Sequence, residues 1–398
     1  MAISLGGDVV ASDISPPPTA ARLPSLAGLR FVCAIAVFCA HAYVTLSFNG
    51  DWTGTRATVA LVVGRSALSF FFVLSGFVMT WSARPGDTAT AFWRRRAAKI
   101  YPTHVLTWFA ALVLINWTGG QVTARQAVPN LLLLHSWSPD FQINNSVNEV
   151  SWSLSCEAFF YLSFPLLIRF LPRVSGRQLW AWTTGAVLGV ILLPLIATTI
   201  MASEPKFPPF DVTFRQYWFV YLFPLTRLLE FVLGILLART VREGRWMGIR
   251  FRHVIAALAV AYPVAVQVPF LYSITAVLIV PVAMLVLAAV SADIRGSRSL
   301  VRGPVMVKLG DITFAFYLVH LLVLQFAYRL LDDGGPASPA HILGSAALLF
   351  AVSLVLAWAM FTYVEQPLSR RWGARRPPKA RSLQPSTAPS TDENSVAP

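Results

Sequence analysis

Hydrophobic residues are gathered along this chain into ten long stretches separated by short polar segments. Each stretch approaches the roughly 20 apolar residues that an α-helix needs to cross a bilayer. A corner at Pro269-Phe270-Leu271 divides the seventh stretch from the eighth. The pattern predicts an all-α polytopic membrane protein with about ten transmembrane helices. The stretches cover residues 26–48, 57–82, 100–118, 152–171, 179–201, 214–238, 253–270, 272–292, 307–331 and 341–364.

The remaining segments are short or polar. The apolar run at 127–137 is too short to cross, so we expect it to be re-entrant or to lie at the membrane surface. The first long stretch resembles the core of a signal peptide, but many more spans follow it, which favours an uncleaved first helix. Residues 1–24 and the basic segment 368–398 have the composition of disordered tails. The membrane domain is therefore predicted to run over 25–367.

Basic residues alternate between the two sides of the predicted spans. With the N-terminus placed in the cytoplasm, most of the 32 Lys and Arg residues fall in cytoplasmic segments. This asymmetry is what the positive-inside rule predicts for ten spans with both termini in the cytoplasm. The net charge of +14 therefore indicates membrane topology and contact with anionic lipid, and we expect no nucleic-acid partner.

The overall composition agrees with a membrane location. Hydrophobic residues make up 56% of the chain and charged residues 13%, whereas soluble domains carry about 25% charged residues. Cys33, Cys39 and Cys156 all lie in apolar stretches and indicate no disulfide framework. We expect a multi-pass protein of the cell membrane, either a plasma or an inner membrane.

The first predicted span contains a histidine, His41, that follows Arg30 by eleven positions. Ionisable groups inside a membrane helix are costly and usually face a polar interior or a pathway. Eleven residues correspond to roughly 16 Å along a helix and to about three turns, so both side chains can face the same way. The pair is consistent with a charged anchor and a proton acceptor. The alternative is a capping histidine and an arginine whose guanidinium reaches the headgroups.

A basic cluster stands at the cytoplasmic edge of the third span. Arginine side chains can hold phosphate oxygens through two hydrogen bonds, so such a cluster could bind a polyphosphate. Basic clusters at this edge are also ordinary topology signals. The cluster and its neighbouring aromatic residue are Arg94, Arg95, Arg96, Lys99 and Tyr101.

The fourth span contains a carboxylate, Glu157, about one and a half turns after Trp152. A carboxylate inside the membrane needs a partner, and His41 or an arginine is the natural one. Beside an imidazole it would fix the tautomer and strengthen the base. The alternative is a purely structural ion pair. Glu149 is predicted to lie in a loop.

Other polar positions give weaker signals. Ser75-Gly76 favours close helix packing over a backbone break near a ligand. Asp311 and His320 are spaced so that they do not share a helix face, and we do not pair them. The histidines His104, His135, His253 and His341 lie near predicted span edges, where we expect interfacial positions. The spacings suggest no metal site, and neither a Walker loop nor a GxSxG element occurs.

Taken together, these segments resemble the membrane-bound acyltransferase family 3, the integral-membrane O-acyltransferases of polysaccharides, lipids and natural products. The resemblance runs from Leu26 to Pro367. Ala27 departs from the family, in which an acidic residue is common at this position. Six segments occur in the family's order: LAGLR with His41 after it, SFFFVLSGF at 69–77, FWRRRAAKIYP at 92–102, VSWSLSCE at 150–157, Gly310 to His320, and YVEQP at 363–367.

The resemblance implies acyl transfer from a cytoplasmic acyl-coenzyme A, with acetyl-coenzyme A as the expected co-substrate and no permanently bound cofactor. His41 would act as the general base, supported by Arg30 and Glu157. The Arg94–Lys99 cluster and Tyr101 would hold the phosphates of coenzyme A. Three further residues of the shared segments are expected to line the substrate site, namely Trp152, Ser153 and Ser75.

The acceptor is implied to be a hydroxyl of a sugar, a polysaccharide or a natural product. The predicted outer loops are short, which favours a small acceptor such as a macrolide over a polymer. The competing class is a proton-coupled transporter, which would also use intramembrane His, Glu and Arg. That class does not explain the phosphate-binding cluster, and the sequence shows no convincing internal repeat. A structural or sensor protein explains fewer of these features.

Overall fold

The computed structural model describes residues 23–46, 55–83, 86–208, 210–246, 248–297, 299–331 and 338–373. These ranges form helices and contain no strand, which confirms the predicted all-α class. Eight helical segments are long and apolar enough to cross a membrane, which makes this a polytopic membrane protein. The long helices are α1 (Pro24–Leu46), α2 (Thr55–Trp81), α3 (Ala89–Trp117), α6 (Trp152–Phe170), α7 (Leu179–Ile200), α9 (Pro224–Arg242), α13 (Pro304–Leu322) and α14 (Pro339–Met360).

The seventh and eighth predicted spans form shorter apolar helices. These are α10 (Phe251–Gln267) with 17 residues and α12 (Ile279–Ile294) with 16 residues. Between them Pro269 leads into α11 (Phe270–Ser273). The predicted corner is therefore longer than three residues, and α10 and α12 are shorter than the predicted spans. The short run at 127–137 forms no crossing helix and falls into α4 (Ala124–Leu131) and a 3-10 turn, η1 (His135–Trp137).

The other short helices cap or extend the long ones. The segments near α6 are α5 (Phe141–Asn144), η2 (Glu149–Ser151) and η3 (Leu171–Arg173). The segments around α9 and α13 are α8 (Phe214–Tyr217), η4 (Trp218–Leu222), η5 (Leu300–Arg302), η6 (Val323–Ala327) and η7 (Tyr328–Leu330). The last two elements are η8 (Phe361–Glu365) and α15 (Gln366–Gly373).

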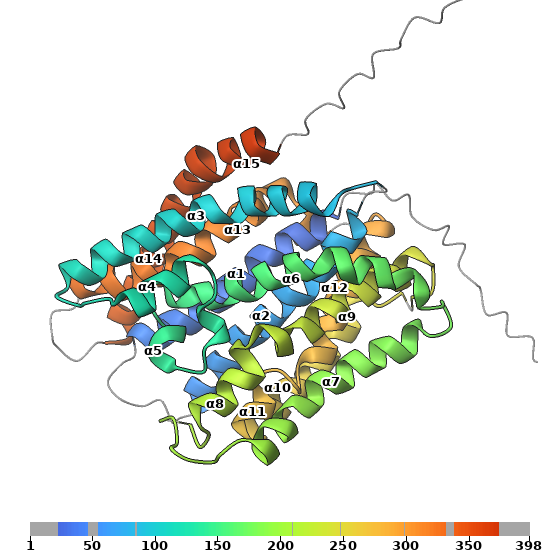
Figure 1. Ribbon diagram of the computed structural model, residues 1–398, viewed down its shortest axis with the longest axis horizontal. Helices are drawn as coiled ribbons and strands as arrows, with labels where there is room; N and C mark the ends of the chain where they lie inside the picture. The colour runs from blue at the N-terminus through green and yellow to red at the C-terminus, as the bar shows by residue number, and fades with distance from the viewer. Residues whose placement is uncertain are drawn as a thin grey trace, which may run out of the picture.

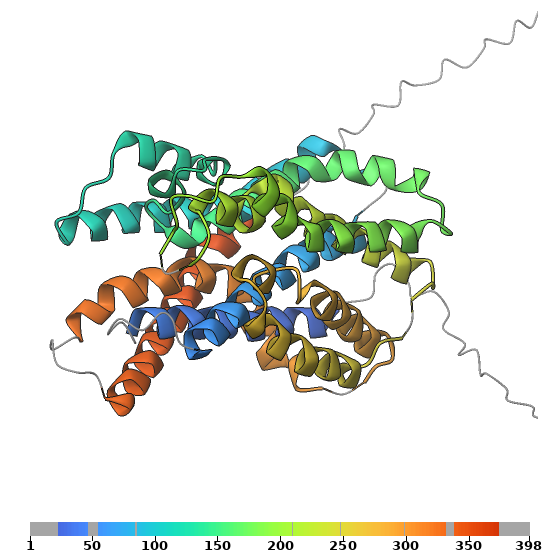
Figure 2. The ribbon, with the colours of Figure 1, turned by 90° about the horizontal axis from the view of Figure 1, so that it is seen from below.

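Helices α1 and α2 form the centre of the bundle (Figures 1 and 2). Helix α2 packs against α1, α9, α10 and α12, and α1 packs against α13 as well. Helices α7 and α14 lie toward the outside, against α9 and α13 respectively. Polar side chains on α1 and α2 can therefore face the interior of the protein.

Two glycines bring α2 and α9 into backbone contact. A Cβ atom on Gly76 would lie 2.0 Å from the carbonyl oxygen of Phe231, and one on Gly234 would lie 1.9 Å from that of Val73. Small residues allow membrane helices to approach this closely. The packing role predicted for Ser75-Gly76 is therefore confirmed, and the contact fixes which face of α2 turns away from α9.

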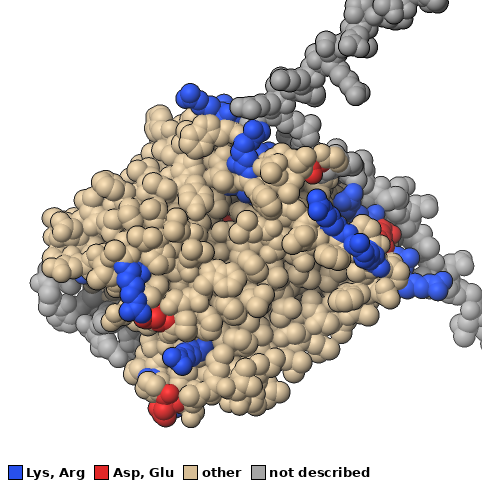
Figure 3. Space-filling view, in the orientation of Figure 1, with Lys and Arg blue, Asp and Glu red and all other residues tan. Residues whose placement is uncertain are grey.

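Most of the basic residues in the described ranges gather at one end of the bundle, which we call the basic end, and a few lie at the opposite end (Figure 3). The starts of α1 and α13 meet the end of α12 there, because Asp293 accepts a hydrogen bond from the Ser25 hydroxyl (2.7 Å) and pairs with Arg302 (3.0 Å). Arg242 at the end of α9 donates to the carbonyl of Thr80 near the end of α2 (3.3 Å). Figure 3 shows a broad uncharged band beside this end, as expected for a surface in contact with lipid.

Candidate active site

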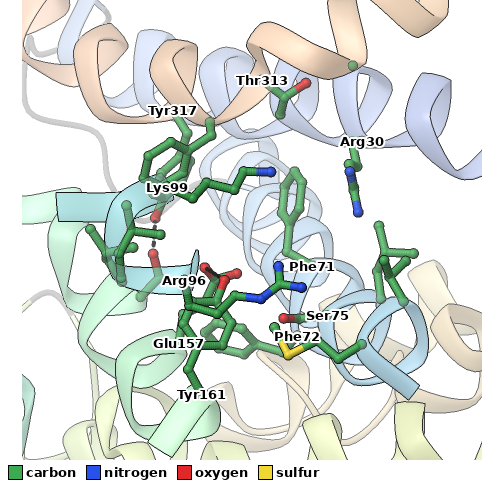
Figure 4. A pocket seen from close by; sticks show the side chains of 18 of the residues that line it. Arg30, Phe71, Phe72, Ser75, Arg96, Lys99, Glu157, Tyr161, Thr313 and Tyr317 are labelled. Carbon is green, nitrogen blue, oxygen red and sulfur yellow. Dashed lines mark hydrogen bonds between the residues drawn. The ribbon is translucent and has the colours of Figure 1, made fainter. Parts of the chain in front are cut away.

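A cavity of about 210 Å³ lies inside the half of the bundle nearer the basic end. Helices α1, α2, α3, α6 and α13 and the turn η8 form its walls, and we call it the main cavity (Figure 4). Its polar lining residues are Arg30, Ser75, Arg96, Lys99, Ser153, Glu157, Tyr161, Asp311, Thr313, Tyr317 and Glu365. Apolar side chains from α2 and α13 complete the wall, so the cavity has a charged part and an apolar part.

Three cations, Arg30, Arg96 and Lys99, face the main cavity from α1 and α3 (Figure 4). Arg96 and Lys99 stand three positions apart on α3, which places them on the same face of that helix. None of the three pairs with a carboxylate within the described ranges, and Nε of Arg96 is buried there without a hydrogen-bond partner. Unpaired cations in a cavity are suited to an anionic ligand.

A second cavity of about 180 Å³ lies where α2 and α6 end and α3 begins. We call it the edge cavity. Arg95, Arg96 and Arg169 contribute to its wall, so Arg96 lines both cavities. Arg95 forms an ion pair there with Asp87. The two cavities together make a basic region that leads from the membrane edge into the protein.

The structure divides the predicted phosphate-binding cluster. Arg96 and Lys99 face the main cavity and Arg95 faces the edge cavity, whereas Arg94 and Tyr101 line neither. Tyr101 is 36% exposed, and its ring contacts that of His104 edge-on at 6.1 Å. The division follows from helix geometry, because five residues spread over two turns cannot all face one side.

Glu157 faces the main cavity but does not reach His41. Its carboxylate accepts a hydrogen bond from the hydroxyl of Tyr161 at 2.8 Å. It interacts electrostatically with Lys99, Arg30 and Arg96, without an ion pair among the described residues. Of the two predicted partners, an arginine lies near Glu157 and the imidazole does not, since α6 packs mainly against α9 and α3 while His41 lies on α1.

The deep part of the main cavity ends at a pair of hydroxyl groups. Ser153 donates to the hydroxyl of Tyr317 (2.8 Å), which in turn donates to the carbonyl of Val150 (3.0 Å). Of the three expected substrate-site residues, Ser75 and Ser153 line the main cavity, whereas Trp152 does not. Trp152 is buried behind the wall, where its ring packs on those of Phe72 and Tyr221.

His41 and His320 contact each other directly just beyond this deep part. Nδ1 of His41 lies 2.9 Å from Nε2 of His320, and the Tyr317 ring is 5.7 Å from the His320 ring, centroid to centroid. His320 is buried, whereas His41 is partly exposed. Neither His41 nor His320 lines the main cavity, whereas Tyr317, one turn before His320 on α13, does.

Two other histidines that we expect near the membrane interface are enclosed by the protein. His104 and His135 are both fully buried. Nε2 of His104 lies 3.2 Å from the carbonyl oxygen of Asn130, and Nε2 of His135 lies 3.2 Å from the Ser151 hydroxyl. The segment that contains α4 and η1 folds back over α3 and the start of α6 and covers them. Glu149, predicted to lie in a loop, is instead part of η2 at the start of α6. Its side chain forms a hydrogen bond with that of Gln325.

Sequence comparison gives an independent result. The family model described as acyltransferase domain matches residues 23–361. The chain is 41% identical over 389 residues to acyltransferase MdmB of Streptomyces mycarofaciens, covering 95% of this chain and 98% of that protein.

Two more distant proteins match over most of their length. Exopolysaccharide production protein ExoZ of Rhizobium meliloti (strain 1021) is 27% identical, with 79% of this chain and 92% of that protein covered. Nodulation protein 10 of Rhizobium leguminosarum bv. viciae is 23% identical, with 75% and 82% covered. No solved structure matches this chain significantly.

Proposed function

This chain belongs to the acyltransferase domain family, and we propose that it moves an acyl group from acyl-coenzyme A to a hydroxyl of a sugar, a polysaccharide or a natural product such as a macrolide. The family match and the 41% identity to an acyltransferase support the transfer. The similarity to an exopolysaccharide production protein supports a carbohydrate-like acceptor. Acetyl-coenzyme A is the donor we expect.

The observation that carries the proposal is the basic region formed by the two cavities. Coenzyme A carries several phosphate oxygens at one end, and a long flexible arm joins them to the sulfur of the thioester. Arg95, Arg96 and Arg169 at the edge cavity can bind those oxygens, while Arg30 and Lys99 attract the donor into the main cavity. Glu157, Asp311 and Glu365 also line the main cavity and offset the charge of its three cations, whereas the edge cavity has three arginines and one carboxylate, Asp87. The pantetheine arm would then carry the thioester toward Tyr317 and the histidine pair.

The reaction needs a base at the deep end. The acceptor hydroxyl oxygen attacks the thioester carbonyl carbon while His41 takes the hydroxyl proton. The tetrahedral intermediate collapses, the carbon–sulfur bond breaks, and the proton passes from His41 to the leaving thiolate. The products are an ester and free coenzyme A. The separation of Arg30 and His41 along α1 would leave room for the charged end of the donor near Arg30 and its reacting end near His41.

The proposal is tested with purified protein in nanodiscs, labelled acetyl-coenzyme A and a panel of acceptors that includes a macrolide and a short oligosaccharide. Wild-type protein should form an acyl ester with at least one acceptor. His41→Ala should lower the rate by at least 100-fold with unchanged insertion, since general-base catalysis contributes about 10²–10⁴-fold. If His41→Ala is as active as the wild type, His41 is not the general base. Acceptor transport by proteoliposomes without any ester product would replace the proposal with a proton-coupled transporter.

A further inference from the structure

The hydrogen bonds of His320 determine which of its nitrogens carries the proton. Its Nδ1 lies 2.7 Å from the carbonyl oxygen of Tyr317 and 3.3 Å from that of Phe316. A carbonyl oxygen only accepts, so Nδ1 must carry a hydrogen and donate it. In a neutral imidazole the other nitrogen is then an acceptor. Nε2 of His320 therefore presents a lone pair toward His41.

This assignment fixes the tautomer of His41 in turn. Two lone pairs facing each other at 2.9 Å would repel, so Nδ1 of His41 carries a hydrogen and donates it to Nε2 of His320. The remaining nitrogen, Nε2 of His41, then carries a free lone pair. Since His320 is 1% exposed and His41 is partly exposed, the solvent-accessible part of the pair belongs to His41.

The surrounding packing holds this arrangement in place. The His320 ring lies parallel to that of Phe316, with centroids 5.8 Å apart and planes 11° apart, and the Phe38 ring lies 6.3 Å away. Phe38 and Phe316 belong to one buried cluster formed by α1, α13 and α14. The His320 ring packs on this cluster, so it cannot turn over without disturbing it.

We propose that His320 is a positioning residue that holds His41 in the Nδ1–H tautomer, so that Nε2 of His41 is the atom that removes the proton from the acceptor hydroxyl. This inference rests on the proposed function. When Nε2 of His41 takes the proton, the Nδ1–H bond to His320 becomes charge-assisted and stronger. His320 thus stabilises the base in the state that forms during the reaction and never touches the substrate.

The kinetic test compares three variants in the nanodisc assay. His320→Phe keeps a ring but removes the acceptor, so kcat should fall by at least 100-fold while the KM for acetyl-coenzyme A stays within about threefold; a wrong tautomer in a catalytic triad costs up to about 10⁴-fold. His320→Gln offers an amide oxygen in place of Nε2 and should keep at least tenfold more activity than His320→Phe. His104→Phe is the matched control, since it removes another buried histidine bonded to backbone carbonyls but distant from His41.

The control and the base variant separate the possible failures. If His104→Phe lowers kcat as much as His320→Phe does, the loss is structural and the inference is overturned. If His41→Ala is inactive while His320→Phe is fully active, only this inference fails. If His41→Ala is fully active, the proposed function fails with it.

A spectroscopic measurement on the wild-type protein needs no variant that might misfold. Ring ¹⁵N resonances of histidine-labelled protein distinguish the Nδ1–H from the Nε2–H tautomer, and loss of one signal in His41→Ala assigns it. We expect His41 as the Nδ1–H form and a hydrogen bond between the two rings. An Nε2–H form of neutral His41 would overturn the inference whatever the kinetics show.

Discussion

At the scale of single residues, Glu157 lies beside arginines and a lysine rather than beside His41, which was the other partner that its place in a membrane helix suggests. Its carboxylate faces the cations of the main cavity and the hydroxyl of Tyr161, and it has no contact with His41. Its charge therefore acts on the donor side of the site. The amide of Glu157→Gln keeps an acceptor for Tyr161, so this variant removes the charge and leaves the hydrogen bond.

We predict that Glu157→Gln binds coenzyme A about fivefold more tightly than the wild type. The loss of one negative charge beside three cations corresponds to roughly 1 kcal/mol, well below the upper limit for close charges in a protein. The pH–rate profile should keep its shape, because the carboxylate does not touch the base. Isothermal titration with coenzyme A and rate measurements across pH provide the two readouts. A shifted profile with unchanged affinity would instead place Glu157 beside His41.

The sequence indicated one half of the histidine pair and missed the other. His41 attracts notice because it interrupts an apolar stretch at a fixed distance from Arg30. The spacing of His320 from Asp311 excludes a pair on one helix face, and nothing in the sequence of α13 points to a partner on α1. Yet both histidines lie at nearly the same distance from the starts of their helices, α1 and α13, and both helices start at the basic end. Equal depth could have suggested the pair, but only the packing of α1 on α13 brings the rings together.

At the scale of elements, hydropathy located every long helix but not every boundary. The third span was predicted to start at residue 100, whereas α3 begins at Ala89 after Thr88, whose side chain accepts from the amide of Ala91 (3.2 Å). The first turns of α3 are helical, but their charged residues exclude them from a span that is located by hydropathy. This extra length matters for function, because it holds the basic residues at the two cavities.

The division of the α3 cluster gives a prediction for the donor site. Arg96→Gln should weaken the binding of coenzyme A by at least tenfold, because a hydrogen bond to a charged group contributes about 1.5–3 kcal/mol. Arg94→Gln is the matched control, since it makes the same charge change two positions away on a residue that lines neither cavity, and we expect less than a twofold effect. Isothermal titration in detergent measures both. Equal losses for the two variants would mean that the cluster serves topology alone.

At the scale of the whole molecule, the bundle brings together residues that lie far apart in the sequence. The main cavity takes side chains from α1, α2, α3, α6 and α13, and the histidine pair joins the first of these helices to the last. Hydropathy alone could order these helices along the chain and set their directions. It could not show which helices pack together, because every lipid-facing and protein-facing helix is similarly apolar.

The orientation of the bundle in the membrane is a prediction that can be tested directly. Both cavities lie in the half of the bundle nearer the basic end, so we expect a cytoplasmic donor to reach them only if this end faces the cytoplasm, as the positive-inside rule also predicts. In sealed proteoliposomes, acetyl-coenzyme A cannot cross the bilayer, and only molecules whose basic end points outward should use external donor. The last long helix, α14, ends toward this end, so a protease-cleavable tag after residue 398 reports the outward fraction. Activity with external donor should rise in proportion to the cleaved fraction. Detergent, which opens the vesicles, should add the activity of the molecules that face inward. If activity instead follows the protected fraction, the donor enters from the opposite end, and the basic cavities would have to be assigned to another anionic ligand.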